Sequence, residues 1–164
     1  SSDVCSSDLG DTSEFLSKNF PKIITIEPSN YFFTKAKFRF SYTSSVEVVH
    51  GESLSNLQDA IASLKALGFT RIAFFLDGHF SGEKIILGER IPTFKSALEF
   101  PVIKEIEIIM SNLNDFIIFV DDIRLFSNFN SPAVANISIS EIIKLAEENS
   151  LKFQFENDMM ILRK

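Results

Sequence analysis

Acidic side chains recur at one kind of position in this sequence, at or just after the end of a short run of Ile, Val, Leu and Phe. Carboxylates that gather in one place repel each other unless a cation or hydrogen-bond donors bind them. They accept hydrogen bonds from sugar hydroxyls, and they coordinate Mg²⁺. A single acid after a strand also commonly caps the following helix, which is the structural alternative for each of them. The acids in this position are Glu27, Glu52, Asp77, Asp121 and Asp122.

Both histidines lie near these acids. His79 stands two residues after Asp77, and an imidazole that changes charge near neutral pH suits a general base. The structural alternative is a histidine that only packs or hydrogen-bonds within its loop. His50 stands directly before Gly51, where it suggests a contact at a strand end.

The acids follow short apolar runs that predict strands buried on both faces. The longest uninterrupted runs have about five residues, too short to cross a bilayer. The predicted strands lie at 22–26, 46–49, 71–76 and 116–120.

Stretches of helical period fill the intervals. The clearest is an apolar stripe with Gly68 directly after it, as at the C-terminus of a helix. Pro28 and Pro101 stand where first helical turns would begin, and Ser138 with Glu141 forms a capping box. The stripe consists of Leu54, Leu57, Ile61, Leu64 and Leu67.

The chain ends on two strand-like runs separated by the turn-forming residues 156–158, which predicts a hairpin. Alternating strands and helices followed by a hairpin predict one α/β domain. Its sheet is Rossmann-like, doubly wound and mostly parallel, with an antiparallel hairpin at the C-terminal end. In such sheets ligands bind beyond the carboxyl ends of the strands, where the acids stand.

The composition is that of a globular chain without a nucleic-acid footprint. The chain has 164 residues, of which 45% are hydrophobic, enough for one domain with its own core. Its formal net charge is −6, with lysines scattered along the sequence. We therefore expect neither a nucleic-acid partner nor a membrane partner.

Two segments resemble the cofactor site of class I S-adenosylmethionine-dependent methyltransferases. Gly10, Asp11 and Thr12 look like the tail of that family's glycine-rich loop. Glu27 stands about 17 residues further on, where the family places an acid on the ribose hydroxyls. A carboxylate there accepts two charge-assisted hydrogen bonds from the diol.

The segment HGES, which follows the second predicted strand, resembles the family segment that borders the adenine. The resemblance implies that Gly51, Glu52 and Ser53 bind this part of the cofactor. Asp77, after the next strand, joins the same cofactor-binding set.

Two further stretches, LDGHFSG and VDDIRLF, resemble the metal-dependent O-methyltransferases related to macrocin and sugar O-methyltransferases. In that group, acids after the fourth and fifth strands bind magnesium beside the transferred methyl. The resemblance implies that Asp77, Asp121 and Asp122 bind Mg²⁺, which prefers oxygen ligands. The structural alternative is that these aspartates cap helices or pair with Arg124 or Lys84.

The resemblance implies transfer of a methyl group from S-adenosylmethionine to a hydroxyl of a small molecule or saccharide, assisted by Mg²⁺. We assign Asp77 and His79 as the catalytic residues, with His79 as the base. The acceptor stays unnamed, because the stretch 83–100 is irregular. The cofactor is made in the cytoplasm, which is therefore the expected location, and the sequence leaves the oligomeric state open.

An alternative function is a non-enzymatic, receiver-like Mg²⁺-binding α/β regulatory module. Such modules also gather acids at strand ends. They carry their acidic pair after the first strand and a lysine after the last. Here the pair Asp121 and Asp122 follows a late strand instead.

Residues 1–9 read SSDVCSSDL and resemble the translation of a common sequencing adapter. We interpret them as an artefact outside the fold, which also sets aside Cys5, the only cysteine. Residues 10–164 then form a partial methyltransferase domain whose first strand is missing. The family places that strand between the second and the fourth, so we expect this chain to be of low stability or inactive.

Overall fold

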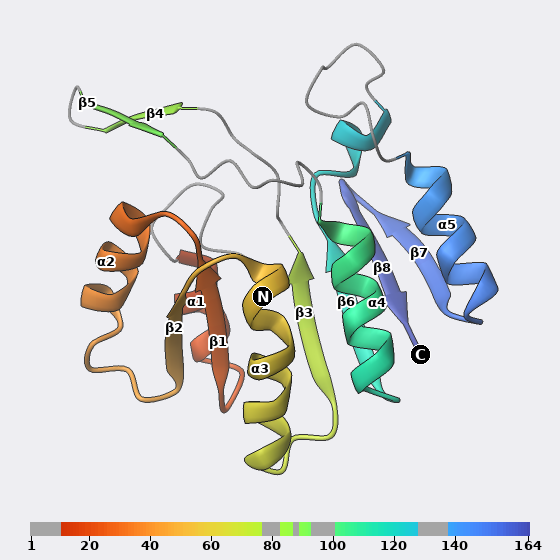
Figure 1. Ribbon diagram of the computed structural model, residues 1–164, viewed down its shortest axis with the longest axis horizontal. Coiled ribbons are helices and arrows are strands. Elements are labelled where there is room, and N and C mark those ends of the chain that lie inside the picture. The colour runs from red at the N-terminus through yellow and green to blue at the C-terminus, as the bar shows by residue number, and fades with distance from the viewer. Residues whose placement is uncertain (1–10, 77–82, 87–88, 93–100, 128–137) are drawn as a thin grey trace.

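The computed structural model describes residues 11–76, 83–86, 89–92, 101–127 and 138–164 (Figure 1). Strands and helices alternate along the chain, which then ends in a hairpin, as the sequence predicts. The strands are β1 (Ile23–Glu27), β2 (Val46–His50), β3 (Ile72–Leu76), β4 (Glu83–Ile86), β5 (Glu89–Pro92), β6 (Phe116–Val120), β7 (Lys152–Glu156) and β8 (Met159–Arg163). The helices are α1 (Asp11–Ser17), α2 (Asn30–Arg39), α3 (Ser53–Ala66), α4 (Val102–Asn112) and α5 (Ile139–Glu148), with a 3₁₀ turn at Ile123–Ser127.

The strands form two separate sheets and a small hairpin. β1 and β2 pair in parallel, and a second sheet has the order β3-β6-β8-β7. In that sheet β3 and β6 are parallel, whereas β8 runs antiparallel to both β6 and β7. The fold is therefore α/β with parallel strands and a C-terminal antiparallel hairpin, which confirms the predicted class. The β4–β5 hairpin was not predicted.

β1 and β3 do not pair with each other. The methyltransferase resemblance predicts a strand between them, and none of the described residues forms one. Helix α3 contacts both β1 and α4, so it links the two sheets on the side that faces the viewer in Figure 1.

The main core lies between the four-stranded sheet and helices α3, α4 and α5. Its centre is dry: Ile118 on β6, Leu162 on β8 and Ile106 on α4 are each 0% exposed. A smaller core packs the start of β1 and β2 against α2. Burial of these apolar side chains is the main favourable contribution to the free energy of folding in both cores.

The helix ends agree with most of the predicted signals. Gly68 follows α3 with a φ of +88°, the left-handed conformation expected after a helix C-terminus. The Ser138 N–H donates to the Glu141 carboxylate across 2.9 Å, as in a capping box. Two details differ: α2 begins at Asn30 rather than at Pro28, and Leu67 leaves the apolar stripe and is 61% exposed.

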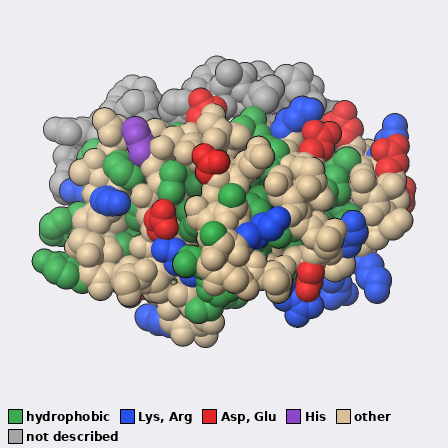
Figure 2. Space-filling model, turned by 60° about the horizontal axis from the view of Figure 1, so that its bottom comes forward, with side chains coloured by type: hydrophobic (Ala, Val, Ile, Leu, Met, Phe, Trp, Pro, Cys, Tyr) green, Lys and Arg blue, Asp and Glu red, His purple; other side chains and the backbone are tan. Residues whose placement is uncertain are grey.

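None of the helices in the described ranges combines the length and the apolar character needed to cross a membrane. On the face drawn in Figure 2, acidic and basic side chains are interspersed.

Candidate functional site

The parallel pairing of β1 with β2 brings two predicted site segments together. Glu27 and His50, the last residues of these strands, are register partners. The Gly51 N–H extends the pairing by donating to the Glu27 carbonyl oxygen across 3.1 Å. The acid predicted to bind ribose and the glycine predicted to border adenine therefore lie side by side.

The Glu27 side chain is fully buried, at 0% exposure. Its Oε1 accepts a hydrogen bond of 2.7 Å from the backbone N–H of Ser29, the residue that caps α2. This bond fixes one edge of the carboxylate and also holds the entry to the helix. Glu27 is thus not itself the N-cap weighed as its structural alternative; its carboxylate instead supports Ser29, the residue that caps α2.

The turn after β2 depends on Gly51, whose φ is +136°. Glu52 follows as the N-cap of α3, and Ser53 is the first residue of that helix. The Asn56 side-chain amide donates to the Glu52 carbonyl oxygen across 2.8 Å and fastens the turn. The HGES segment therefore leads directly into the N-terminus of a 14-residue helix.

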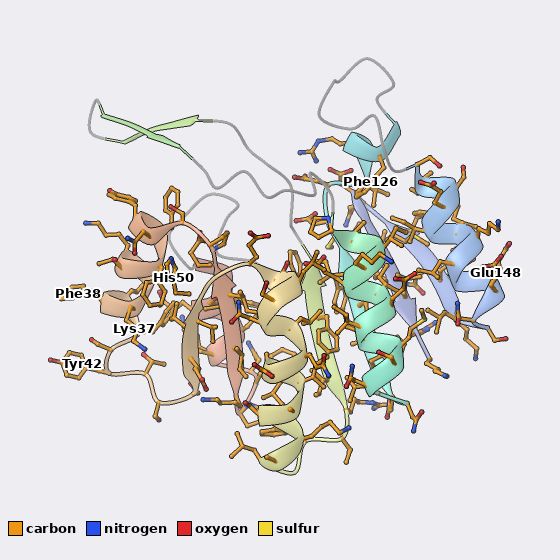
Figure 3. The ribbon with its side chains drawn as sticks, viewed as in Figure 1. Lys37, Phe38, Tyr42, His50, Phe126 and Glu148 are labelled. Atoms are coloured by element: carbon orange, nitrogen blue, oxygen red, sulfur yellow. The ribbon has the colours of Figure 1, made fainter. Side chains whose placement is uncertain are left out.

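The exposed His50 ring lies against a ring of α2. Its centroid is 4.7 Å from that of Phe33, with 34° between the planes. Figure 3 shows His50 between β2 and α2. The contact agrees with the strand-end placement expected for this histidine.

The other predicted cofactor contacts are less fully described. Asp11 and Thr12 are the first residues of α1, and Gly10 lies outside the described residues. Asp77 and His79 also lie outside them, so their cofactor-binding and catalytic roles stay predictions.

β3 and β6 also end in register, with Leu76 opposite Val120. The Asp121 N–H donates to the Leu76 carbonyl oxygen across 3.0 Å, which carries the pairing one residue further. Asp121 therefore stands at the carboxyl edge of the parallel strands, as predicted. Its Oδ1 accepts a hydrogen bond of 2.8 Å from the Asp122 N–H.

Asp122 turns away from the strand direction with a φ of +54°. The Arg124 guanidinium approaches its Oδ1 to 2.6 Å, which is the ion pair named as its structural alternative. Arg124 also pairs with Asp158 in the β7–β8 turn, and its backbone N–H donates to Asp158 Oδ1 across 3.0 Å. Within the described residues, no three His, Cys, Asp or Glu side chains are grouped to hold a metal ion.

Sequence reasoning missed Glu105. This residue lies in the first turn of α4, is 0% exposed, and neither carboxylate oxygen has a hydrogen-bond partner in the described structure. Burial raises the pKa of Glu105 above its ordinary value of 4.5, and the nearby Ser53 hydroxyl on α3 lowers it by less than burial raises it. A signal was present, because Glu105 falls on the apolar stripe that Val102 and Ile109 define.

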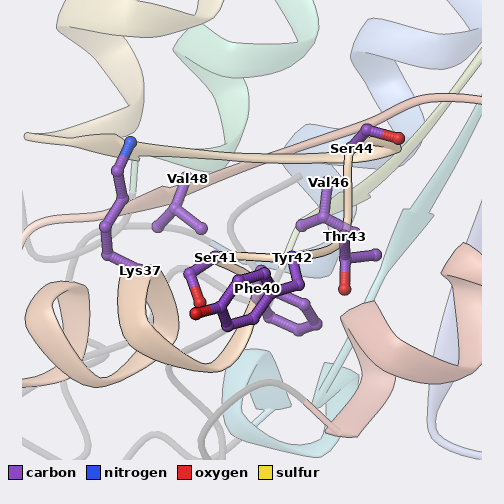
Figure 4. Close-up of a pocket in the computed structure, with 8 residues that line it drawn as sticks. All are labelled: Lys37, Phe40, Ser41, Tyr42, Thr43, Ser44, Val46 and Val48. Atoms are coloured by element: carbon purple, nitrogen blue, oxygen red, sulfur yellow. The ribbon is translucent and has the colours of Figure 1, made fainter.

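A pocket of about 330 Å³ lies elsewhere, at the opposite end of α2 and β2 from Glu27 and His50 (Figure 4). It contains one basic side chain and no acid, so it does not match the predicted site. Its lining consists of Lys37, Phe40, Ser41, Tyr42, Thr43, Ser44, Val46 and Val48.

No model of a known protein family matches the sequence, and no curated protein matches it either. Solved structures do resemble the fold. A Staphylococcus aureus protein provisionally assigned as a caffeoyl-CoA O-methyltransferase superposes with a TM-score of 0.57 at 14% identity, covering 94% of this chain and 70% of that one. The PH0226 protein of Pyrococcus horikoshii OT3 gives a TM-score of 0.48 at 13% identity, covering 94% and 76%. The first of these superpositions shows that the chain shares the α/β fold of that O-methyltransferase-like structure.

Replacing Gly51 by alanine is expected to lower the free energy of unfolding by about 1–3 kcal/mol, the usual cost of a side chain in such a backbone conformation. The new Cβ would lie 2.5 Å from the Asn56 amide nitrogen, which is already held by the Glu52 carbonyl. Gly68→Ala is the matched control, because its φ is also positive but nothing lies within 4 Å of the added Cβ. Chemical denaturation measures both, and equal losses would contradict the steric part of this explanation.

Glu105→Gln is expected to stabilise the protein at neutral pH. The pKa of Glu105 is raised in the folded state, so folding favours the protonated carboxyl. The stability that Glu105 contributes to the folded protein is therefore fully present below about pH 4.5, and it is lost as pH rises through the folded pKa. The variant should therefore gain stability over the parent at pH 7, with a difference that shrinks toward pH 4. Thermal unfolding across this pH range measures the difference in stability between the variant and the parent. Glu107→Gln, at a half-exposed position on the same helix, is the control. A difference that does not change with pH would refute this explanation.

Proposed function

We propose that this chain belongs to an S-adenosylmethionine-dependent O-methyltransferase that acts on a hydroxyl of a small molecule or saccharide. The observation that carries the proposal is the pairing of Glu27 with the His50–Gly51 turn at the carboxyl end of β1 and β2. The methyltransferase-like fold supports it. The Staphylococcus aureus protein is only provisionally assigned to caffeoyl-CoA, and that assignment concerns that protein alone.

The residues present fit the cofactor that the fold implies. A buried carboxylate oriented by the Ser29 N–H is suited to accept hydrogen bonds from a ribose diol. The Gly51 turn brings backbone close to the same edge, and α3 begins there, where the first N–H groups of a helix have no acceptor within the helix. When bound, S-adenosylmethionine supplies the electrophilic methyl group.

The chain's own contribution to the reaction is position and proton handling. Holding the cofactor at the edge of β1 and β2 and the acceptor near the ends of β3 and β6 would place donor and acceptor at attack distance. We assign proton removal from the acceptor hydroxyl to His79, two residues after Asp77 in the sequence.

We also propose that Asp121 and Asp77 bind Mg²⁺ next to the acceptor, with Asp122 as the third predicted ligand. Asp121 supports this by its place at the end of β6. The Asp122–Arg124 ion pair weighs against Asp122 as a direct ligand, because the guanidinium already neutralises its charge. The antiparallel β7–β8 hairpin argues against the receiver-like alternative, which leaves that hairpin unexplained.

The test is calorimetric titration of S-adenosylhomocysteine, with and without Mg²⁺. We expect micromolar binding that Glu27→Gln weakens about 10- to 100-fold, because each hydrogen bond to a charged group contributes about 1.5–3 kcal/mol. Glutamine keeps an acceptor for the Ser29 N–H while it removes the charge. Glu47→Gln on β2, whose side chain is 49% exposed, is the matched control.

A second arm of the titration uses a version in which a strand is fused ahead of Gly10, to occupy the place between β1 and β3. Absence of binding in both arms, with cooperative unfolding showing that the proteins are folded, would discard the cofactor assignment. Binding that Glu27→Gln leaves unchanged would discard the role of Glu27.

A further inference from the structure

In the described part of the chain, the outer edge of β7 pairs with no other strand. β7 is the last strand in the order β3-β6-β8-β7, and among the described strands it pairs only with β8. Four of its five residues are exposed, and Phe153 is half-buried. An open edge presents a row of unpaired N–H and C=O groups, to which another strand can add.

The sequence of this edge is complementary to itself. β7 reads KFQFE, so in an antiparallel pair of two copies centred on Gln154, Lys152 of one copy stands opposite Glu156 of the other. Phe153 stands opposite Phe155 in the same arrangement. A two-fold axis through Gln154 repeats both contacts, as a dimer of identical chains requires. Opposite charges and aromatic pairs are the cross-strand neighbours that stabilise antiparallel sheets.

Among the described residues, the charges at the two ends of β7 have no such cross-strand partners. Lys152 stands opposite Arg163 of β8, which places two like charges in register, and Glu156 stands opposite Met159. In the described part of the chain, neither Lys152 nor Glu156 forms an ion pair. They are four residues apart on one strand, or about 13 Å, too far to pair with each other. Glu156 of a second copy would offset the repulsion between Lys152 and Arg163.

β7 carries two aromatic residues, of which one packs against the core and the other is exposed. Phe153 packs against the main core beside α5, whereas Phe155 is 48% exposed. Their rings meet edge-on, with centroids 6.1 Å apart and 72° between the planes. In the self-paired arrangement Phe155 would cover Phe153 of the other copy, while Gln154 and the charged residues share the opposite face.

We propose that β7 is a self-association edge, at which two copies of this chain pair antiparallel through Lys152–Glu156. Charged residues on an edge strand usually block pairing, but this order of charges selects one antiparallel register and disfavours a parallel one. The contact is short compared with standard interfaces, so the dimer is weak and dissociates on dilution. This proposal does not depend on the proposed methyl transfer.

Sedimentation velocity over a wide concentration range at low salt tests it. We expect a reversible monomer–dimer equilibrium that Lys152→Glu or Glu156→Lys each weakens about tenfold or more, because two symmetry-related attractions become repulsions. The double variant Lys152→Glu with Glu156→Lys restores the attractions and should restore the dimer. Lys35→Glu on α2 makes the same change in net charge as Lys152→Glu, away from β7, and should have no effect.

The single variants are expected to fold. Lys152→Glu places an acid opposite Arg163 within the chain, and Glu156→Lys lies opposite Met159 at an exposed position. Thermal unfolding followed by circular dichroism checks this. A chain that stays monomeric at all concentrations, a dimer that neither single variant weakens, or a double variant that fails to recover would each overturn the proposal.

Discussion

The structure depends on parallel strands that end in register. β1 and β2 finish together at Glu27 and His50, and β3 and β6 finish together at Leu76 and Val120. In both pairs one further backbone hydrogen bond carries the pairing past the last residue. Because parallel strands present their carboxyl ends at the same edge, this alignment gathers the polar residues that follow each strand. The buried apolar faces of these strands pack against the helices and hold that edge in position.

The packing that supports this edge is unevenly distributed. The four-stranded sheet has helices and a dry core to hold it. The β1–β2 pair is held by a smaller core against α2 and by α3, which contacts β1 and α4. The polar edge of β1 and β2 therefore depends on α3, since this helix starts at the HGES turn and also joins the two sheets. Glu105 is buried opposite the start of α3, so the contact between α3 and α4 contains a carboxyl group whose burial lowers the stability of the fold.

Much of the fold and part of the site could be predicted from the sequence. Periodicity gave the strands, the helices and the terminal hairpin, because apolar spacing is a local property of the chain. The placement of Glu27 and Asp121 followed from the same pattern. Pairing of Asp122 with Arg124 was the structural alternative that the sequence offered. The contact of Arg124 with Asp158 was not foreseen, because it joins the end of β6 to a turn more than thirty residues later. The β4–β5 hairpin was missed because its residues show no clear alternation.

The sequence by itself determined which elements form, in what order, and which side chains stand at the strand ends. Only the tertiary structure decided how those side chains are used. It turned Asp122 toward Arg124, set the Glu27 carboxylate on the Ser29 N–H, buried Glu105 without a hydrogen-bond partner among the described residues, and left β1 and β3 unpaired. The reason is physical: secondary structure follows from local spacing, whereas the burial and pairing of a polar group depend on neighbours brought close by the whole fold.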